Sequence, residues 1–217
     1  MSSDDRIERA DLTYQRSVFT GDVDELEAAE RGLDGVDADS ALARGRLLHA
    51  RFLARRDRDA TEDPRELPLF QRALELYRTL GDRRGEGESL FWVGIVHQVV
   101  RGDHDLAVPI YEQSRDLATK AGDKWTLSEV LRHLGIAAHA AGRLREAREH
   151  LTESSRLRRE IGHLPGVASN MIGLAYITSA EGRRAEAMAV LAEAHVLAEA
   201  HGARNIARQV EEARGRI

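Results

Sequence analysis

The nine histidines of this chain are its richest source of chemistry, because imidazole both binds metal ions and transfers protons near neutral pH. Three of them, His97, His133 and His139, fall in segments that we expect to be the first helices of successive helix pairs. They are the candidate ligands of an alternative metal or acid–base site. His133 and His139 are six positions apart, however, whereas two ligands on one helix are usually three or four apart. The leading interpretation therefore has no metal.

Other constellations of reactive residues are equally weak. Glu160 and His163 have the Glu-x-x-His spacing of a carboxylate-bridged metal site, but Gly162 between them predicts a turn. Glu146 and His150, four positions apart, are typical of a pair on a helix surface. The chain has no cysteine, which excludes disulfides, thiolate metal sites and cysteine nucleophiles. We predict no catalytic residue and no cofactor, and we favour binding over catalysis.

Regularly spaced glycines indicate which elements position these side chains. One series recurs every forty residues, and each of its members is followed five positions later by an alanine; the pairs are Gly102 and Ala107, Gly142 and Ala147, and Gly182 and Ala187. A second series lies about midway between the members of the first: Gly81, Gly122, Gly162 and Gly202. This periodicity predicts a repeat protein in which each repeat has two helices and two glycine-marked turns.

The segments between the glycines have helical periodicity. Leu127, Val130, Leu131 and Leu134 form an i, i+3, i+4, i+7 stripe, and the aromatic content of 5% is low for a β protein. We expect helices at 4–19, 22–32, 38–56, 65–80, 84–101, 103–121, 124–141, 143–161, 165–181, 183–201 and 203–215. The predicted fold is an all-α, right-handed α-solenoid of about five antiparallel helix pairs with a C-terminal capping helix. Residues 1–217 would form one domain, with less regular repeats in 1–80, three regular repeats in 81–201 and the cap in 202–217.

Composition limits the classes of partner and location. A net charge of -5 argues against a nucleic-acid partner, because neutralising phosphates requires a concentrated basic surface. The acidic start of the sequence lacks the apolar segment of a secretory leader, and no apolar run is long enough for a bilayer, so we expect a cytoplasmic protein without membrane contact. Ile206 and Val210 on the last helix would either cap the array or pair with a second copy, which leaves monomer and homodimer open.

The repeat resembles the tetratricopeptide repeat, whose first helix carries a Leu-Gly pair, whose turn carries glycine and whose second helix carries alanine five residues later. The best match is Leu134-Gly135 with Gly142 and Ala147, and the preceding repeat has a one-residue irregularity near Gly94. The repeat length of about forty residues is similar to that of the helical arrays in bacterial regulatory and signalling proteins of the maltose-regulator type.

The resemblance implies a concave groove, lined by the first helices, that binds peptides or small ligands. The groove residues would be Trp92, Glu129, Arg132, His139, Asn170, Ile172 and Tyr176. Arg132 would hold a carboxylate or phosphate while Trp92 or Tyr176 packs on the ligand. In the competing interpretation Trp92 fills the core and Arg132 pairs with Glu129.

The expected function is therefore that of a regulatory adaptor or sensor that binds a protein or peptide partner in this groove. The alternative is a helical solenoid that binds a small molecule or a metal and uses the region of His97, His133 and His139 for catalysis.

Overall fold

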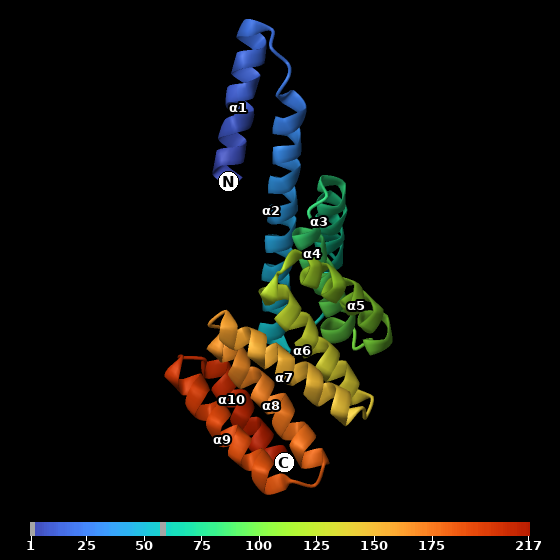
Figure 1. Ribbon diagram of the computed structural model, residues 1–217, viewed down its shortest axis with the longest axis vertical. Coiled ribbons are helices and arrows are strands. Elements are labelled where there is room, and N and C mark those ends of the chain that lie inside the picture. Colours follow the sequence, from blue (N-terminus) through green and yellow to red (C-terminus); the bar gives the residue numbers. More distant parts are fainter. Residues whose placement is uncertain (1–2, 57–59) are drawn as a thin grey trace. The chain divides into compact units, whose positions relative to one another are not determined.

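The computed structural model describes residues 3–56 and 60–217, and these residues are almost entirely helical (Figure 1). Their helices are α1 (Ser3–Thr20), α2 (Leu26–Arg55), α3 (Glu66–Leu80), α4 (Arg83–Ile95), the π-helix η1 (Val96–Val100), α5 (His104–Ala121), α6 (Lys124–Ala140), α7 (Leu144–Glu160), α8 (Leu164–Ala180), α9 (Arg184–Ala200) and α10 (Arg204–Arg216). No β-strand occurs in these two ranges, which confirms the all-α prediction. Within the same ranges, no helix is both long and apolar enough to span a bilayer.

The chain forms two compact units, Met1–Ile110 and Tyr111–Ile217. In the first unit, α1 packs on α2, α2 on α3, and α3 on α4. In the second, α6 packs on α7, α7 on α8, α8 on α9, and α9 on α10, with α10 also contacting α8. Packing between successive helices is the arrangement expected of an α-solenoid.

The predicted glycine turns are present at all seven positions of the two series, each of which has a positive φ. At Gly142, φ is 73°, and the next amide, of Arg143, donates to the carbonyl of Ala138 at 2.9 Å. This is the left-handed helix end that glycine adopts without a Cβ clash. An aspartate then caps some of the following helices, as Asp123 does for the amide of Thr126 at 3.2 Å.

The alanines that follow the first glycine series, Ala107, Ala147 and Ala187, are all fully buried. A methyl group at this position allows neighbouring helices to approach closely, whereas a larger side chain would force them apart.

A π-helix accounts for the irregularity expected near Gly94. Gly102 follows Gly81 by 21 positions, whereas each later glycine of the two series follows its predecessor by 20. The amide of Arg101 donates to the carbonyl of Val96 at 3.1 Å, five residues back, so η1 holds one residue more than an α-helical turn would. The inserted residue therefore widens one helical turn, and the order of helices and glycine turns is unchanged.

One predicted boundary is wrong: the helices expected at 22–32 and 38–56 are a single helix, α2. A Cβ on Gly35 would lie 2.5 Å from Nη1 of Arg6, and one on Gly45 would lie 2.4 Å from Cε1 of Phe70. These glycines therefore permit close approach of a neighbouring side chain and do not end the helix. In sequence alone the two uses of glycine look alike.

Candidate functional site

A pocket of about 230 Å³ opens in the second unit between α6 and α8. Its lining residues are Arg132, Gly135, Ile136 and His139 of α6, Leu151 of α7, Ser169, Ile172, Gly173 and Tyr176 of α8, and Gln209 of α10. The structure thus brings together four of the seven predicted groove residues, namely Arg132, His139, Ile172 and Tyr176. Gln209 was not predicted, because α10 was expected to cap the array or to pair with a second copy.

Two glycines make room for this pocket. A Cβ on Gly173 would lie 2.8 Å from Cδ1 of Leu151, and one on Gly135 would lie 3.0 Å from its Cγ. Both contacts are tighter than ordinary van der Waals packing. Glycine at both positions lets α6 and α8 approach the same leucine of α7, which becomes part of the pocket lining.

Arg132 is fixed by the amide of Asn170. Its Nη1 donates to Oδ1 of Asn170 at 3.0 Å, and Asn170 is fully buried. Nδ2 of Asn170 donates to the hydroxyls of Ser154 at 2.9 Å and Ser155 at 3.1 Å, and those hydroxyls donate in turn to the carbonyls of Ser128 and Leu151. Because these hydroxyls act as acceptors for Nδ2, the amide oxygen must face Arg132.

A buried ion pair lies beside this amide. Arg158 is 2% exposed; its Nη2 lies 2.6 Å from Oε1 of Glu129, and its Nη1 donates to the carbonyl of Gly166 at 2.7 Å and to Oδ1 of Asn170 at 3.3 Å. Glu129 therefore pairs with Arg158. The competing interpretation, in which Arg132 pairs with Glu129, is wrong. Neither Glu129 nor Asn170 lines the pocket; both support residues at its edge.

The importance of Arg158 was missed, although the sequence contains a signal for it. Ala147, Leu151, Ser154 and Arg158 are spaced i, i+4, i+7, i+11 on α7, and all four are buried. An arginine that continues a buried stripe must find internal partners.

The site carries more positive than negative charge. Burial, together with the positive charge of Arg158, lowers the pKa of Arg132 to about 10, while Glu129 opposes the shift. The guanidinium still stays protonated at neutral pH. Two arginines and one glutamate share the buried network, so one positive charge is left over, and Arg132 is the arginine that lines the pocket.

Comparison with known proteins finds a family similarity over part of the chain. Residues 88–160, from within α4 to the end of α7, match the tetratricopeptide repeat family model. This part of the chain is similar to tetratricopeptide repeats. Such repeats generally mediate protein–protein interactions. A comparison with curated proteins finds no match, and the resemblance to the longer, maltose-regulator-type repeat stays a prediction.

Trp92 lies in the tetratricopeptide match but belongs to the first unit, where its ring has aromatic neighbours. It stacks on Phe70 with centroids 5.4 Å apart and an interplanar angle of 17°, and it meets His49 edge-on at 5.6 Å. The guanidinium carbon of Arg46 lies 5.6 Å from the ring centroid. These contacts anchor Trp92 to the core of its own unit, and its role in a groove stays a prediction.

The histidines of the alternative metal site lie in different surroundings. His97 is on η1 in the first unit, where burial and the charge of Arg101 lower its pKa. The ring of His133 lies 5.7 Å from that of Tyr111, while His139 lines the pocket. Among residues 3–56 and 60–217, no group of three or more His, Asp or Glu side chains is arranged to hold a metal ion.

Proposed function

We propose that this tetratricopeptide repeat protein is an adaptor or sensor that binds a protein or peptide segment, with the α6–α8 pocket as the anchoring site. The observation that carries the proposal is the convergence of Arg132, His139, Ile172 and Tyr176 on one pocket, from the first helices of two successive repeats. The family's general role in protein–protein interaction supports it.

The lining suits a single side chain of a bound segment. Ile136, Ile172 and Tyr176 supply apolar surface, while Arg132 and Ser169 supply polar atoms that fix orientation. A pocket of about 230 Å³ is too small for a folded element, so the rest of the segment would lie along the neighbouring helix surfaces.

Selection of a phage-displayed library of short random peptides on the full-length protein tests this proposal. Selected peptides would be labelled and titrated by fluorescence anisotropy against the wild type and Tyr176→Ala. Because an aromatic side chain in a pocket is a typical binding hot spot, we expect binding to weaken at least about tenfold. Val196→Ala, on an exposed part of α9, is the matched control.

Unchanged affinity in Tyr176→Ala, or the same loss in Val196→Ala, would remove the pocket from the proposal. Failure to select any peptide would favour the alternative, a small-molecule-binding solenoid, which the small, partly enclosed pocket also suits.

A further inference from the structure

The pocket holds a positive charge that the chain itself does not neutralise. Within the part of the chain that the structure describes, Arg132 is within ion-pair distance of no carboxylate, and the only nearby glutamate in the network, Glu129, is taken by Arg158 at 2.6 Å. A buried charge is costly unless it is paired. A ligand that brings one negative charge to Arg132 would offset that cost.

We propose that the α6–α8 pocket binds a carboxylate group attached to a small apolar body. This rests on the proposed function and names the chemistry that the pocket recognises. Asn170 accepts only one of the five N–H donors of the Arg132 guanidinium, and a carboxylate can accept two parallel N–H bonds from such a fork. Ile172 and Tyr176 would pack on the apolar body.

Charge balance selects a carboxylate over a phosphate. The excess in the network is a single positive charge, which one carboxylate neutralises. A phosphate monoester, with close to two negative charges at neutral pH, would leave a net negative charge in a buried site. The hydrogen bonds from Asn170 to Ser154 and Ser155 hold the amide that positions Arg132, so the site is largely preorganised.

The test uses phenylacetate as the probe and the ¹H–¹⁵N spectrum of the full-length protein as the readout. Phenylacetate should shift the amide signals of Gly135, Ile172 and Gly173 in a saturable way. Phenylacetamide, which has the same shape without the charge, and inorganic phosphate should each bind at least about tenfold more weakly. Equal binding of phenylacetamide, tighter binding of phosphate, or no shift with phenylacetate would overturn the proposal.

Two variants assign the effect to Arg132. Arg132→Gln should abolish phenylacetate binding, while Arg132→Lys, which keeps the charge but loses the fork, should bind with intermediate affinity. Arg145→Gln removes an arginine whose side chain is 94% exposed on α7 and should bind as the wild type does. Wild-type affinity in a folded Arg132→Gln protein would refute the assignment. If that variant unfolds, the comparison of phenylacetate with phenylacetamide on the wild-type protein still tests the proposal.

The selected peptides separate this proposal from the adaptor function. If the peptides need an acidic residue and phenylacetate displaces them, the carboxylate belongs to the partner segment. If phenylacetate binds but the peptides need no acidic residue, the pocket takes a free small acid. If the peptides depend on Tyr176 and phenylacetate does not bind, the adaptor function stands and the carboxylate site is wrong.

A different observation, on the α1–α2 hairpin, carries a second inference. The side of α1 that packs on α2 is formed by small or polar residues with i, i+4, i+7, i+11 spacing: Arg6, Ala10, Thr13 and Ser17. Thr13 is 6% exposed, whereas Phe19 is 85% exposed. The usual amphipathic pattern is therefore reversed, since most large apolar side chains of α1 face solvent.

Two exposed stripes run side by side along this hairpin. On α1 the stripe is Ile7, Asp11, Tyr14 and Val18; on α2 it is Leu26, Glu30, Leu33 and Asp37. On each helix, the exposed stripe follows by one residue the stripe that packs on the other helix. The packing stripe of α2 includes Ala29, which is buried. In an antiparallel pair, equal offsets place both stripes on the same side, and we call these eight residues the hairpin face.

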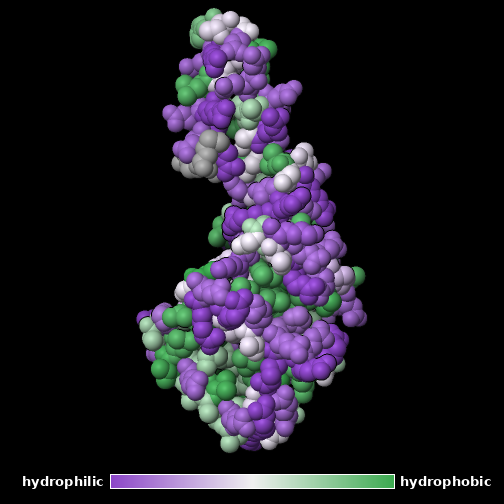
Figure 2. All heavy atoms as spheres, viewed as in Figure 1, coloured by the Kyte–Doolittle hydropathy of each residue, from purple (hydrophilic) through white to green (hydrophobic). Residues whose placement is uncertain are grey.

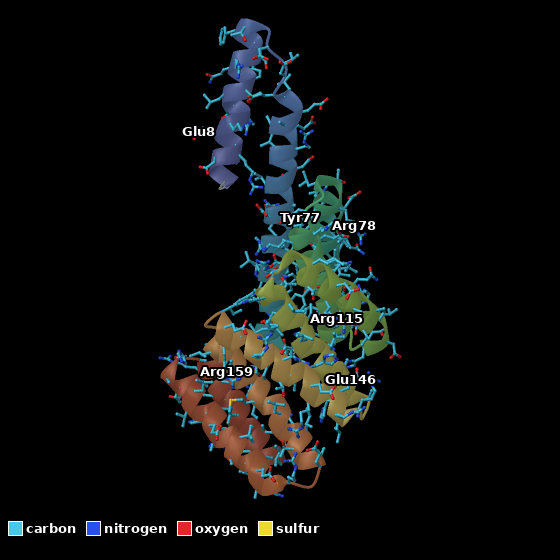
Figure 3. All side chains as sticks on the ribbon, in the orientation of Figure 1. Glu8, Tyr77, Arg78, Arg115, Glu146 and Arg159 are labelled. Carbon is cyan, nitrogen blue, oxygen red and sulfur yellow. The ribbon has the colours of Figure 1, made fainter. Side chains whose placement is uncertain are left out.

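The hairpin face combines apolar and acidic side chains. Tyr14 is 65% exposed and Val18 59%, and none of Asp11, Glu30 and Asp37 forms an ion pair with any residue that the structure describes. Some other acids of the hairpin are paired, as Asp22 is with Arg16 at 2.6 Å. Figure 2 shows hydrophobic and hydrophilic side chains mixed on the hairpin surface, and in Figure 3 Glu8 points away from α2.

We infer that the hairpin face docks an amphipathic helix of a partner protein with lysine or arginine beside its apolar stripe. The apolar residues supply burial, and the three acids supply complementary charge. A second copy of this chain would set Asp11, Glu30 and Asp37 against the same three acids, which is unfavourable. The face runs from Ile7 to Val18 on α1, about 17 Å, enough for about three turns of a partner helix.

Fluorescence anisotropy with two synthetic amphipathic helices of about 18 residues tests this inference. The two have the same leucine stripe, with lysine on the polar face of one and glutamate on that of the other. The lysine peptide should bind, the glutamate peptide should not, and added salt should weaken the complex. The triple variant Asp11→Asn, Glu30→Gln, Asp37→Asn should bind at least about tenfold more weakly.

The matched control neutralises three exposed acids on other helices: Asp105→Asn, Glu193→Gln and Glu199→Gln. An equal loss in this control would show attraction to net charge alone and overturn the inference. So would a dimer in sedimentation equilibrium that Val18→Ser dissociates, because the occupant would then be a second copy.

Discussion

Arg132 donates a hydrogen bond of 3.0 Å to the amide oxygen of Asn170, and this contact joins the pocket to the buried core of the second unit. The same oxygen also accepts from Arg158 at 3.3 Å, and Arg158 pairs with Glu129. The Arg132 guanidinium, which lines the pocket, is thus positioned by side chains that do not themselves line the pocket. Changes in that core should alter both stability and binding.

Arg158→Met tests the core side of this connection. Removing one partner of a buried ion pair leaves Glu129 without its partner, so we expect the free energy of unfolding of the second unit to fall by about 3–5 kcal/mol. Urea denaturation followed by circular dichroism measures it. The neighbouring Arg159, exposed on α7 and labelled in Figure 3, provides the control, since Arg159→Met should change stability by no more than about 0.5 kcal/mol. Similar losses in both variants would mean that the buried pair has no special role.

The stability of the second unit should depend on pH through His163. Burial, and then the charge of Arg158, lower the pKa of His163 below its ordinary value near 6.5, against the opposing effect of Glu129. The unfolded chain therefore binds the proton more readily, and the free energy of unfolding falls as the pH drops below about 6.5 towards the folded-state pKa.

His163→Gln should flatten that decline. The ring of His163 lies 4.7 Å from that of Trp125, so tryptophan fluorescence reports on this region during urea unfolding between about pH 7.5 and pH 5.5. His201→Gln, at an exposed position, should follow the wild-type curve. Parallel pH curves for His163→Gln and the wild type would contradict the assignment.

Gly45→Ala should destabilise the first unit, although alanine is the better helix former. The new Cβ would lie 2.4 Å from the ring of Phe70, which is fully buried, and relieving such a clash costs about 1–3 kcal/mol against a helix gain of about 1 kcal/mol. Thermal unfolding measures the net loss. Gly215→Ala, with no atom within 4 Å of the added Cβ, should be neutral or stabilising. A stabilised Gly45→Ala protein would show that α2 and α3 are not so closely packed.

Tyr77→Phe isolates one hydrogen bond in the first unit. The hydroxyl of Tyr77, a residue labelled in Figure 3, donates to Oδ1 of Asp39 at 2.6 Å, and burial together with this carboxylate raises the pKa of the phenol. We expect a loss of about 0.5–1.5 kcal/mol in chemical denaturation, because Phe keeps the packing and removes only the hydroxyl. Tyr14→Phe, on the exposed side of α1, should have almost no effect. A neutral Tyr77→Phe would indicate that water replaces the bond at no cost.

The repeat architecture and most helix boundaries were predictable because they depend on local chemistry. Gly142 ends α6 because its own backbone is left-handed. Asp123 caps the start of α6 by accepting a hydrogen bond from an amide only three residues away. Even the π-helix left a trace, since one additional residue separates Gly81 from Gly102. Each of these signals acts within a few positions of the sequence.

The resemblance to the tetratricopeptide repeat implied a groove that includes Arg132, His139, Ile172 and Tyr176, and the pocket contains all four. Gln209 could not be found in this way, because it reaches the pocket from α10, and only the packing of α10 on α8 brings it there.

By itself, the sequence determined the helical periodicity and the glycine turns, since these follow from backbone preference and residue spacing. Only the tertiary structure decided that Gly35 and Gly45 serve close approach and not a turn, that Glu129 pairs with Arg158 and not with Arg132, and that Asn170 is buried. The physical reason is that desolvation and pairing depend on side chains that are 12 to 38 positions apart in the chain, as Asn170 is from Arg158 and from Arg132, and local preference does not specify them.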